Sequence, residues 1–338
     1  MQDPRLESRE SLEIVRLRSL QEKLQRRLCS RNLGGCWRQN SNNGYDSGWL
    51  SFLYFYAFEP IAYMNKTIIN FCPTGMVPMK KDTPHVPVTP SEIIEQTHEA
   101  YEIGITIAHL HARASDEQPT YHKNIYQEIF EGVRKHCPGL IICGSTSGRT
   151  FPEFEKRSAV IELKPDMCSL TLSSLNFAHQ SSVNSPDMII RLITKMKEYG
   201  VTPEYECFDS GMINYGKYLI SKGYHEGPHY WNLLFGNIAG FQGTYLQIGT
   251  ALSEIPNDHY IAFAGLGASQ LKVNATAIAM GYGVRVGLED NLWWNHQRTQ
   301  LTTNTALLQR IHRLLEIHEK ELFTSSELGA KGFYNKSK

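Results

Sequence analysis

Short apolar runs alternate with helix-forming segments from residue 64 to the end of the chain. Residues 67–72 are β-branched and apolar, and Thr89, Pro90 and Ser91 then open a helix, since proline is well tolerated in a first helical turn. The same order recurs. The pattern predicts strands at residues 67–72, 104–110, 140–144, 167–172, 204–208, 231–235, 260–264 and 283–288. It predicts helices from residue 89 and at residues 122–136, 151–163, 186–199, 212–222, 246–253, 269–280 and 303–321.

Eight strands that are each followed by a helix predict an α/β protein of the (β/α)8 TIM barrel class, in which the chemistry lies at the carboxyl ends of the strands. A doubly wound open sheet is the main alternative. It fits less well, because the first strand runs into Pro-Thr-Gly-Met and not into a Gly-x-Gly-x-x-Gly turn.

The first 63 residues differ from the rest of the chain, since all 13 histidines follow residue 84. The aromatic run at residues 49–58 is too short for a membrane helix, which needs roughly 17 to 25 apolar residues. We therefore divide the chain into a poorly ordered extension at 1–63 and a catalytic barrel at 64–338. The extension is translated upstream sequence if the native protein starts at Met64. A partner-binding or membrane-touching segment is the alternative.

Composition narrows the class of protein. The 34 Lys and Arg residues balance the 34 Asp and Glu residues, which excludes a general binder of nucleic acid. A hydrophobic fraction of 41% with 20% charged residues is typical of a soluble globular protein with no membrane span. The seven cysteines contain no Cys-x-x-Cys pair, so we expect buried thiols and a reducing, cytoplasmic location.

The strongest chemical signal is His109 and His111 at the end of the second predicted strand. Residues two apart on a strand point to the same face, so both imidazoles can reach one metal ion. Strand eight of a closed barrel pairs with strand one, which pairs with strand two. Glu289 at the end of strand eight can therefore supply a third ligand. Zn2+ suits this set of ligands, although two hydrogen-bonded histidines would explain His109 and His111 without a metal.

Polar residues also follow the third, fourth and fifth strands. The turn Cys143-Gly-Ser145-Thr-Ser147-Gly148-Arg149 supplies hydroxyls, flexible backbone and a cation that are suited to binding a carboxylate or phosphate, but a plain polar turn explains it almost as well. Ser169, Thr171 and Asn176 offer hydroxyls and an amide to a carbonyl oxygen, or cap the next connection. Glu206 belongs to a group of acids expected at the barrel mouth.

Several of these motifs are similar to one known family. From residue 64 to the C-terminal helix, about four fifths of the chain, the sequence resembles the β-keto acid cleavage enzymes, which include 3-keto-5-aminohexanoate cleavage enzyme. The matching stretches are Cys72-Pro-Thr-Gly, Pro87-Val-Thr-Pro-Ser-Glu-Ile, His109-Leu-His-Ala-Arg, Ser174-Leu-Asn-Phe, Pro203-Glu-Tyr-Glu-Cys-Phe-Asp-Ser-Gly and Arg285-Val-Gly-Leu-Glu-Asp-Asn.

The resemblance implies a zinc-dependent (β/α)8 acyltransferase of amino acid catabolism that converts a small β-keto acid and acetyl-CoA to acetoacetate and a new acyl-CoA. It implies zinc ligation by His109, His111 and Glu289, and acid–base chemistry by Asp290 with Arg285. It also implies substrate binding at Ser145, Gly148 and Ser169, with Glu206 as a further carboxylate in the site. Family members tend to form symmetric homo-oligomers, so an assembly such as a tetramer is expected.

One departure from the family concerns the substrate. The member that acts on an amino substrate has an acid after the first-strand Thr-Gly turn, and the corresponding position here is Val77. Because an unpaired buried ammonium is costly, we expect a β-keto acid that is neutral or apolar at its far end.

Two other functions are compatible with the sequence. A barrel hydrolase of the amidohydrolase type also uses His-x-His, but on its first strand, and would here have to recruit His179 and His229. A non-catalytic zinc- or CoA-binding barrel is the second alternative. The presence of Arg285, Glu289 and Asp290 together favours an enzyme.

Overall fold

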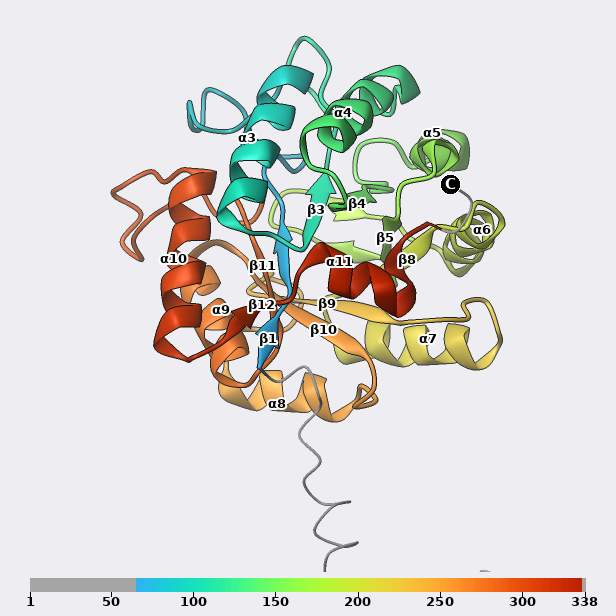
Figure 1. The fold of residues 1–338 in the computed structure, drawn as a ribbon. Helices are drawn as coiled ribbons and strands as arrows, with labels where there is room; N and C mark the ends of the chain where they lie inside the picture. Colours follow the sequence, from blue (N-terminus) through green and yellow to red (C-terminus); the bar gives the residue numbers. More distant parts are fainter. Residues whose placement is uncertain (1–64, 336–338) are drawn as a thin grey trace, which may run out of the picture. The chain divides into compact units, whose positions relative to one another are not determined.

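The computed structural model describes residues 65–335, so the predicted extension lies outside the described residues. Eight parallel strands close a barrel in the order β10-β11-β2-β3-β4-β5-β8-β9, and helices surround it (Figure 1). The strands are β2 (Ile69–Phe71), β3 (Ile107–Leu110), β4 (Ile141–Gly144), β5 (Met167–Thr171), β8 (Thr202–Cys207), β9 (Tyr230–Phe235), β10 (Tyr260–Gly265) and β11 (Gly283–Val286). The predicted (β/α)8 barrel is confirmed.

One helix follows each barrel strand. The helices are α3 (Pro90–Ile103), α4 (Lys123–His136), α5 (Phe154–Ser158), α6 (Pro186–Glu198), α7 (Ser210–Ser221), α8 (Tyr245–Ser253), α9 (Gln270–Ala279) and α10 (Asn304–Ile317). Side-chain caps fix several starts: Thr89 and Glu92 form a capping box at α3, and Asp209 caps α7. The predicted helix at 151–163 is divided into α5 and a 3-10 helix at Ala159–Leu163.

The two ends of the predicted barrel sequence differ from expectation. The helix predicted to reach residue 321 ends at Ile317, and Glu319 adopts a left-handed φ of 53° that stops it. The chain then forms β12 (Glu321–Leu322), which pairs with β1 (Lys66–Thr67). The first predicted strand is consequently split, because β1 pairs with β12 while β2 pairs with β11 and β3.

The C-terminal segment closes the amino-terminal end of the barrel. Phe323, Leu328 and Phe333 pack against residues that begin the barrel strands, such as Ile107 and Tyr230. Leu328 ends α11 (Ser325–Leu328), which crosses in front of the barrel in Figure 1. Since this end is filled with apolar side chains, ligands have access only at the carboxyl ends of the strands.

Two further observations bear on the sequence predictions. The five cysteines within residues 65–335 are free and buried, as expected. Among the same residues, no helix is both long and apolar enough to cross a membrane. The aromatic run at residues 49–58 lies outside the described part of the chain.

Candidate active site

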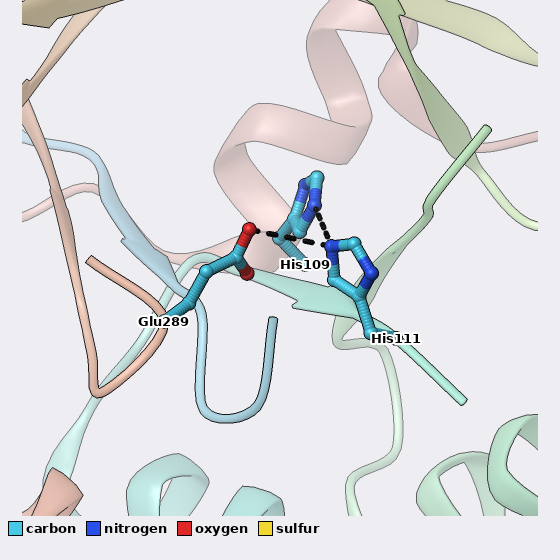
Figure 2. A group of neighbouring side chains, drawn as sticks. All are labelled: His109, His111 and Glu289. Carbon is cyan, nitrogen blue, oxygen red and sulfur yellow. Dashed lines mark hydrogen bonds and ion pairs between the residues drawn. The ribbon is translucent and has the colours of Figure 1, made fainter. Parts of the chain in front are cut away.

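His109 and His111 point toward one another at the carboxyl end of β3 (Figure 2). Their Nε2 atoms lie 3.2 Å apart, and both side chains are buried. Zinc–imidazole bonds of about 2.0–2.1 Å at a tetrahedral angle place two nitrogens roughly 3.3 Å apart. The separation therefore matches that of two ligands of one metal ion.

Glu289 completes the trio from the segment after β11. Its Oε1 lies 3.3 Å from His111 Nε2, and its Oε2 is buried without a hydrogen-bond partner among the described residues. A buried carboxylate oxygen without a donor is costly, and a cation would satisfy it. The ligand atoms of His109, His111 and Glu289 all lie within 4.8 Å of one another. These residues fit a metal ion.

The opposite nitrogen of His109 contacts a buried acid. His109 Nδ1 donates to Glu204 Oε2 over 2.7 Å, and Glu204 also accepts from Asn70, Asn232 and Cys143. Burial lowers the pKa of His109, but the carboxylates of Glu204 and Glu289 together outweigh burial and raise the pKa to about 9. A carboxylate on Nδ1 fixes the tautomer and ring orientation, so Nε2 faces the metal position.

A second possible metal trio shares His109. His109, Cys143 and Glu204 are also close enough to hold an ion. In that trio, however, His109 and Cys143 both donate hydrogen bonds to Glu204, and burial raises the pKa of the Cys143 thiol well above its usual range. A thiol must lose its proton to bind a metal. The trio with Glu289 is therefore the better candidate.

Arg285 joins three carboxylates at the end of β11. It donates from Nε to Asp290 over 3.0 Å, from Nη2 to Glu289 over 2.7 Å and from Nη1 to Glu206 over 3.1 Å. Burial raises the pKa of Asp290, and Arg285 opposes that rise. The Cys72 thiol also donates to Asp290 Oδ2. Asp290 is thus a buried carboxyl held in one orientation, with a raised affinity for a proton.

Glu206 lies on the other side of Arg285. Thr171 donates to its second oxygen over 2.8 Å. Burial raises the pKa of Glu206, and the nearby Glu204 raises it further while Arg285 lowers it. The cluster therefore offers two buried carboxyls of raised pKa, Asp290 and Glu206, on either side of one guanidinium.

The loop after β2 covers one side of this site. Arg113 donates to three backbone carbonyls, those of Gly75, Pro78 and Glu117. Gly75 has a φ of 65°, and a Cβ there would lie 2.4 Å from Glu289 Cγ. Only glycine lets the loop approach the Glu289 side chain so closely.

The trio and the Arg285 cluster line one cavity of about 270 Å³. A family model described as beta-keto acid cleavage enzyme matches residues 66–331 of this chain. The chain belongs to the beta-keto acid cleavage enzyme family. As a member, it is an enzyme of the acetyl-CoA-dependent transferase type that characterises its relatives.

Two relatives illustrate the similarity. A 3-oxoadipate:acetyl-CoA acetyltransferase of Cupriavidus necator is 34% identical over 78% of this chain and 93% of that protein. A 3-keto-5-aminohexanoate cleavage enzyme of Acetoanaerobium sticklandii is 32% identical over 78% of this chain and 97% of its own length. A solved ternary complex of ObcA with C4-CoA adduct and oxalate shares the fold, with a TM-score of 0.65 and 18% identity over 73% of this chain and 67% of the other.

The cavity of this family member contains most, but not all, of the residues that the sequence singled out. It is lined by His109, His111, Glu289, Arg285, Asp290, Glu206, Ser145 and Thr171. Gly148 instead packs against the Arg157 guanidinium, and the Ser169 hydroxyl accepts from the Thr146 amide. The Asn176 side chain is exposed on β6 (Leu175–Asn176). A substrate role for these last three stays a prediction.

Sequence reasoning missed part of the lining. Phe177 and Ser182 reach the cavity from an antiparallel hairpin of β6 and β7 (Ser181–Ser182), whose two-residue strands are too short to give a periodic signal. Phe208, Leu234 and Leu266 add apolar surface where their strands end. Phe208 and Leu266 directly follow β8 and β10, and Leu234 lies one residue before the end of β9. Phe208 also belongs to the matching family stretch that begins at Pro203.

The histidines that a hydrolase would need lie elsewhere. His229 precedes β9 at the closed end of the barrel, where its ring stacks on that of His259. His179 is exposed between β6 and β7. Neither lines the cavity, so the described residues do not form the alternative hydrolase arrangement.

Proposed function

We propose that this protein transfers acyl groups between a small β-keto acid and acetyl-CoA, with acetoacetate and a new acyl-CoA as products. The observation that carries the proposal is the shared cavity, in which the His109, His111 and Glu289 trio meets the Asp290–Arg285 pair. The names of the relatives, which pair a β-keto acid with acetyl-CoA or describe cleavage of one, support the same reaction. Every atom of the two substrates is retained, and no water is consumed.

The metal we propose is Zn2+. Two imidazoles and one carboxylate that leave a further position open are typical of catalytic zinc. When bound, zinc acts as a Lewis acid that polarises the β-keto oxygen of the substrate. His111 is suited to bind zinc, because burial lowers its pKa and so favours the neutral imidazole that can act as a ligand.

Asp290 is the proposed base. Its carboxylate takes the proton from the carbon between the keto and carboxyl groups, and the resulting carbanion attacks the acetyl carbonyl of acetyl-CoA. Arg285 holds both Asp290 oxygens, at 3.0 and 3.2 Å, and so keeps the base oriented. The C–S bond of acetyl-CoA then breaks, and the CoA sulfur bonds to the former β-keto carbon. Cleavage of the bond between that carbon and its neighbour C2 leaves the new acyl-CoA and releases acetoacetate as an enolate, which takes up a proton. Glu206 provides a second buried carboxyl that can hold a proton during these transfers.

Ser145 and Thr171 are the proposed hydroxyl donors to substrate oxygens, since both line the cavity. Gly148 and Ser169 correspond to substrate-binding positions of the family, and Asn176 follows them in the same region of the chain. The preferred substrate lacks an ammonium at its far end, because the cavity offers Val77 where the amino-substrate enzyme has an acid.

Mass spectrometry of CoA species tests the reaction directly. Zinc-loaded protein is mixed with acetyl-CoA and a pool of β-keto acids, and we expect new acyl-CoA esters in amounts equal to acetoacetate. Glu289→Ala removes the proposed metal ligand and should abolish them. Glu226→Ala is the matched control, since Glu226 is exposed and pairs with Lys197 on the surface.

Two outcomes would contradict the proposal. Acetyl-CoA that survives every acid, while the protein holds one zinc per chain, would leave the metal site standing and remove the assigned chemistry. Free CoA without any new thioester would indicate hydrolysis.

Assembly and location belong to the same proposal. Free, buried thiols suit a reducing compartment, so we place the enzyme in the cytoplasm. We expect a homo-oligomer, and light scattering coupled to size-exclusion chromatography will give its mass.

A further inference from the structure

Arg149, which is half-buried, differs from the three buried arginines of the barrel. Arg285 pairs with three carboxylates, and Arg113 donates to three backbone carbonyls. Arg157 donates to the carbonyls of Thr146 and Val183 and to the side chain of Asn184. Within residues 65–335, the Arg149 guanidinium has no ion pair, and its Nε is buried without a hydrogen-bond partner.

The guanidinium of Arg149 is nevertheless held in place. Its Cζ lies 3.6 Å from the centroid of the Phe177 ring, a close cation–π contact. Arg149 and Phe177 both line the cavity that contains the metal trio. A partly desolvated cation with unfilled donors is unfavourable alone, and an oxyanion that accepts two of its N–H groups would offset the cost.

The acids of the cavity do not fill this role. Glu206, Glu289 and Asp290 are each already bound by Arg285, and Asp290 also accepts from Cys72. The missing anion must therefore come from a ligand that enters the cavity.

We propose that Arg149 binds a second carboxylate at the far end of the β-keto acid, so that the preferred substrate is a β-keto dicarboxylic acid. This inference rests on the proposed function. It keeps the expectation drawn from Val77 that the far end of the substrate has no ammonium, and it replaces the neutral or apolar far end of that expectation with an anionic one.

The shape of the cavity favours this source of the carboxylate. The lining of the same cavity includes the apolar side chains of Leu175, Phe208 and Leu234, which suit a short methylene chain. The 1-carboxylate of any β-keto acid is only two carbons from the keto group and so stays near the proposed metal. The phosphates of CoA are separated from its thioester by the whole pantetheine arm, and a cavity of about 270 Å³ does not hold them beside the reacting atoms.

Three six-carbon substrates separate the possibilities: 3-oxoadipate, 3-oxohexanoate and 3-keto-5-aminohexanoate. They differ mainly in the far end, which is anionic, apolar or cationic. We expect kcat/KM to be highest for 3-oxoadipate and lowest for the amine. Equal or better turnover of 3-oxohexanoate by the native enzyme would overturn the inference.

Arg149→Met tests the residue, because it keeps an unbranched apolar side chain against Phe177 and removes the charge. We expect kcat/KM for 3-oxoadipate to fall about 10- to 100-fold, with little change for 3-oxohexanoate. Arg149→Lys should recover part of the loss, since it restores charge but not the two-pronged geometry. Arg191→Met is the matched control: Arg191 also stacks on a phenylalanine, Phe154, but outside the cavity.

The other sources of the anion give different results. An equal loss for both acids would assign Arg149 to the 1-carboxylate, and a rise confined to the KM for acetyl-CoA would assign it to a CoA phosphate. Either result overturns the inference. Calorimetric binding of 3-oxoadipate without acetyl-CoA gives a readout that needs no turnover: Arg149→Met should weaken it by the same factor. Absence of acyl-CoA products with all three acids would instead refute the proposed function.

Discussion

Two groups of histidines lie at opposite ends of the same barrel, and their proton affinities differ. At the open end, the carboxylates of Glu204 and Glu289 raise the pKa of His109 to about 9 against the effect of burial, whereas burial lowers the pKa of His111. At the closed end, burial and neighbouring imidazoles lower the pKa of His225 to about 3 and that of His229 to about 4. Burial alone therefore does not set the proton affinity of a histidine, because the charges that surround the ring also contribute.

The hydrogen bonds of the two groups explain the contrast. At the closed end, Trp231 donates its indole N–H to His259 Nδ1, so that nitrogen is an acceptor and the ring packs as a neutral group. At the open end, His109 donates from Nδ1 and keeps Nε2 for a metal. One end is built for stability and the other for chemistry, as in other (β/α)8 enzymes.

Replacement of the proposed base should have the largest effect at the open end. Asp290→Asn keeps the shape of the side chain but cannot take a proton, so kcat should fall about 10²- to 10⁴-fold. Zinc content, measured by atomic emission, should stay at one per chain, because Asp290 is not a ligand. A variant that loses its zinc along with its turnover would show that Asp290 acts on the metal site instead.

A substitution that creates a void at the closed end should lower the stability of the protein and leave its activity unchanged. Phe333→Ala removes a fully buried ring from the apolar plug, which should lower the free energy of unfolding by roughly 3–5 kcal/mol. Urea denaturation measures this loss. Steady-state kinetics at 25 °C should match those of the native enzyme, and a large change in kcat would argue against the separation of the two ends.

Loss of the Glu204 carboxylate, which contacts His109 Nδ1, should weaken the binding of zinc. Glu204→Gln leaves a similar side chain but removes the charge that orients His109, and zinc affinity should fall about 10- to 100-fold. Competition with a chromophoric chelator gives the affinity. The control is His229→Phe at the closed end, which should leave zinc affinity unchanged; an equal decrease in both variants would contradict a specific role for Glu204.

The pH dependence of stability should show the smallest effect, and it depends directly on the low pKa values of His225 and His229 at the closed end. The folded-state pKa values of His225 and His229 lie below the usual value near 6.5, so the unfolded chain binds more protons as the pH falls. Their contribution to stability is complete above pH 6.5. It is lost toward pH 4, by about 1.4 kcal/mol per pH unit for each histidine.

His229→Phe tests this dependence, because the buried Nε2 of His229 has no hydrogen-bond partner among the described residues and a phenyl ring can keep the stacking. Urea midpoints at pH 7, 6 and 5 should decline less steeply in the variant than in the native protein. Parallel declines would mean that His229 does not contribute.

The metal trio was predictable because it depends on two general rules. Strand residues two apart share a face, and a closed barrel pairs its last strand with its first, as β11 does with β2. Those rules bring the ends of β3 and β11 close together, and His111 and Glu289 follow these ends within three residues. The pairing of β2 with β3 completes the argument.

The residues that sequence reasoning misplaced or missed depend on loops. A hydroxyl or amide after a strand can face the cavity or satisfy the backbone, and Ser145 takes the first course while Ser169 takes the second. Glu204 and Glu206 share a strand, yet only Glu206 lines the cavity, because Glu204 lies deeper behind His109. The turn that contains Ser145 and Arg149 indicated an anion site from its sequence, but only the structure shows that the Arg149 Nε lacks a hydrogen-bond partner among the described residues.

The bracing of the loop after β2 also bears on how this enzyme can change. Arg113 donates hydrogen bonds to backbone carbonyl oxygens, which every residue has. These hydrogen bonds therefore do not depend on the side chains at Met76 and Val77. Both of those side chains line the cavity. Substitutions at positions 76 and 77 can therefore change the substrate preference while Arg113 and Gly75 keep the path of the loop and its distance from Glu289. Substrate specificity can diverge at these two positions without a change in the fold.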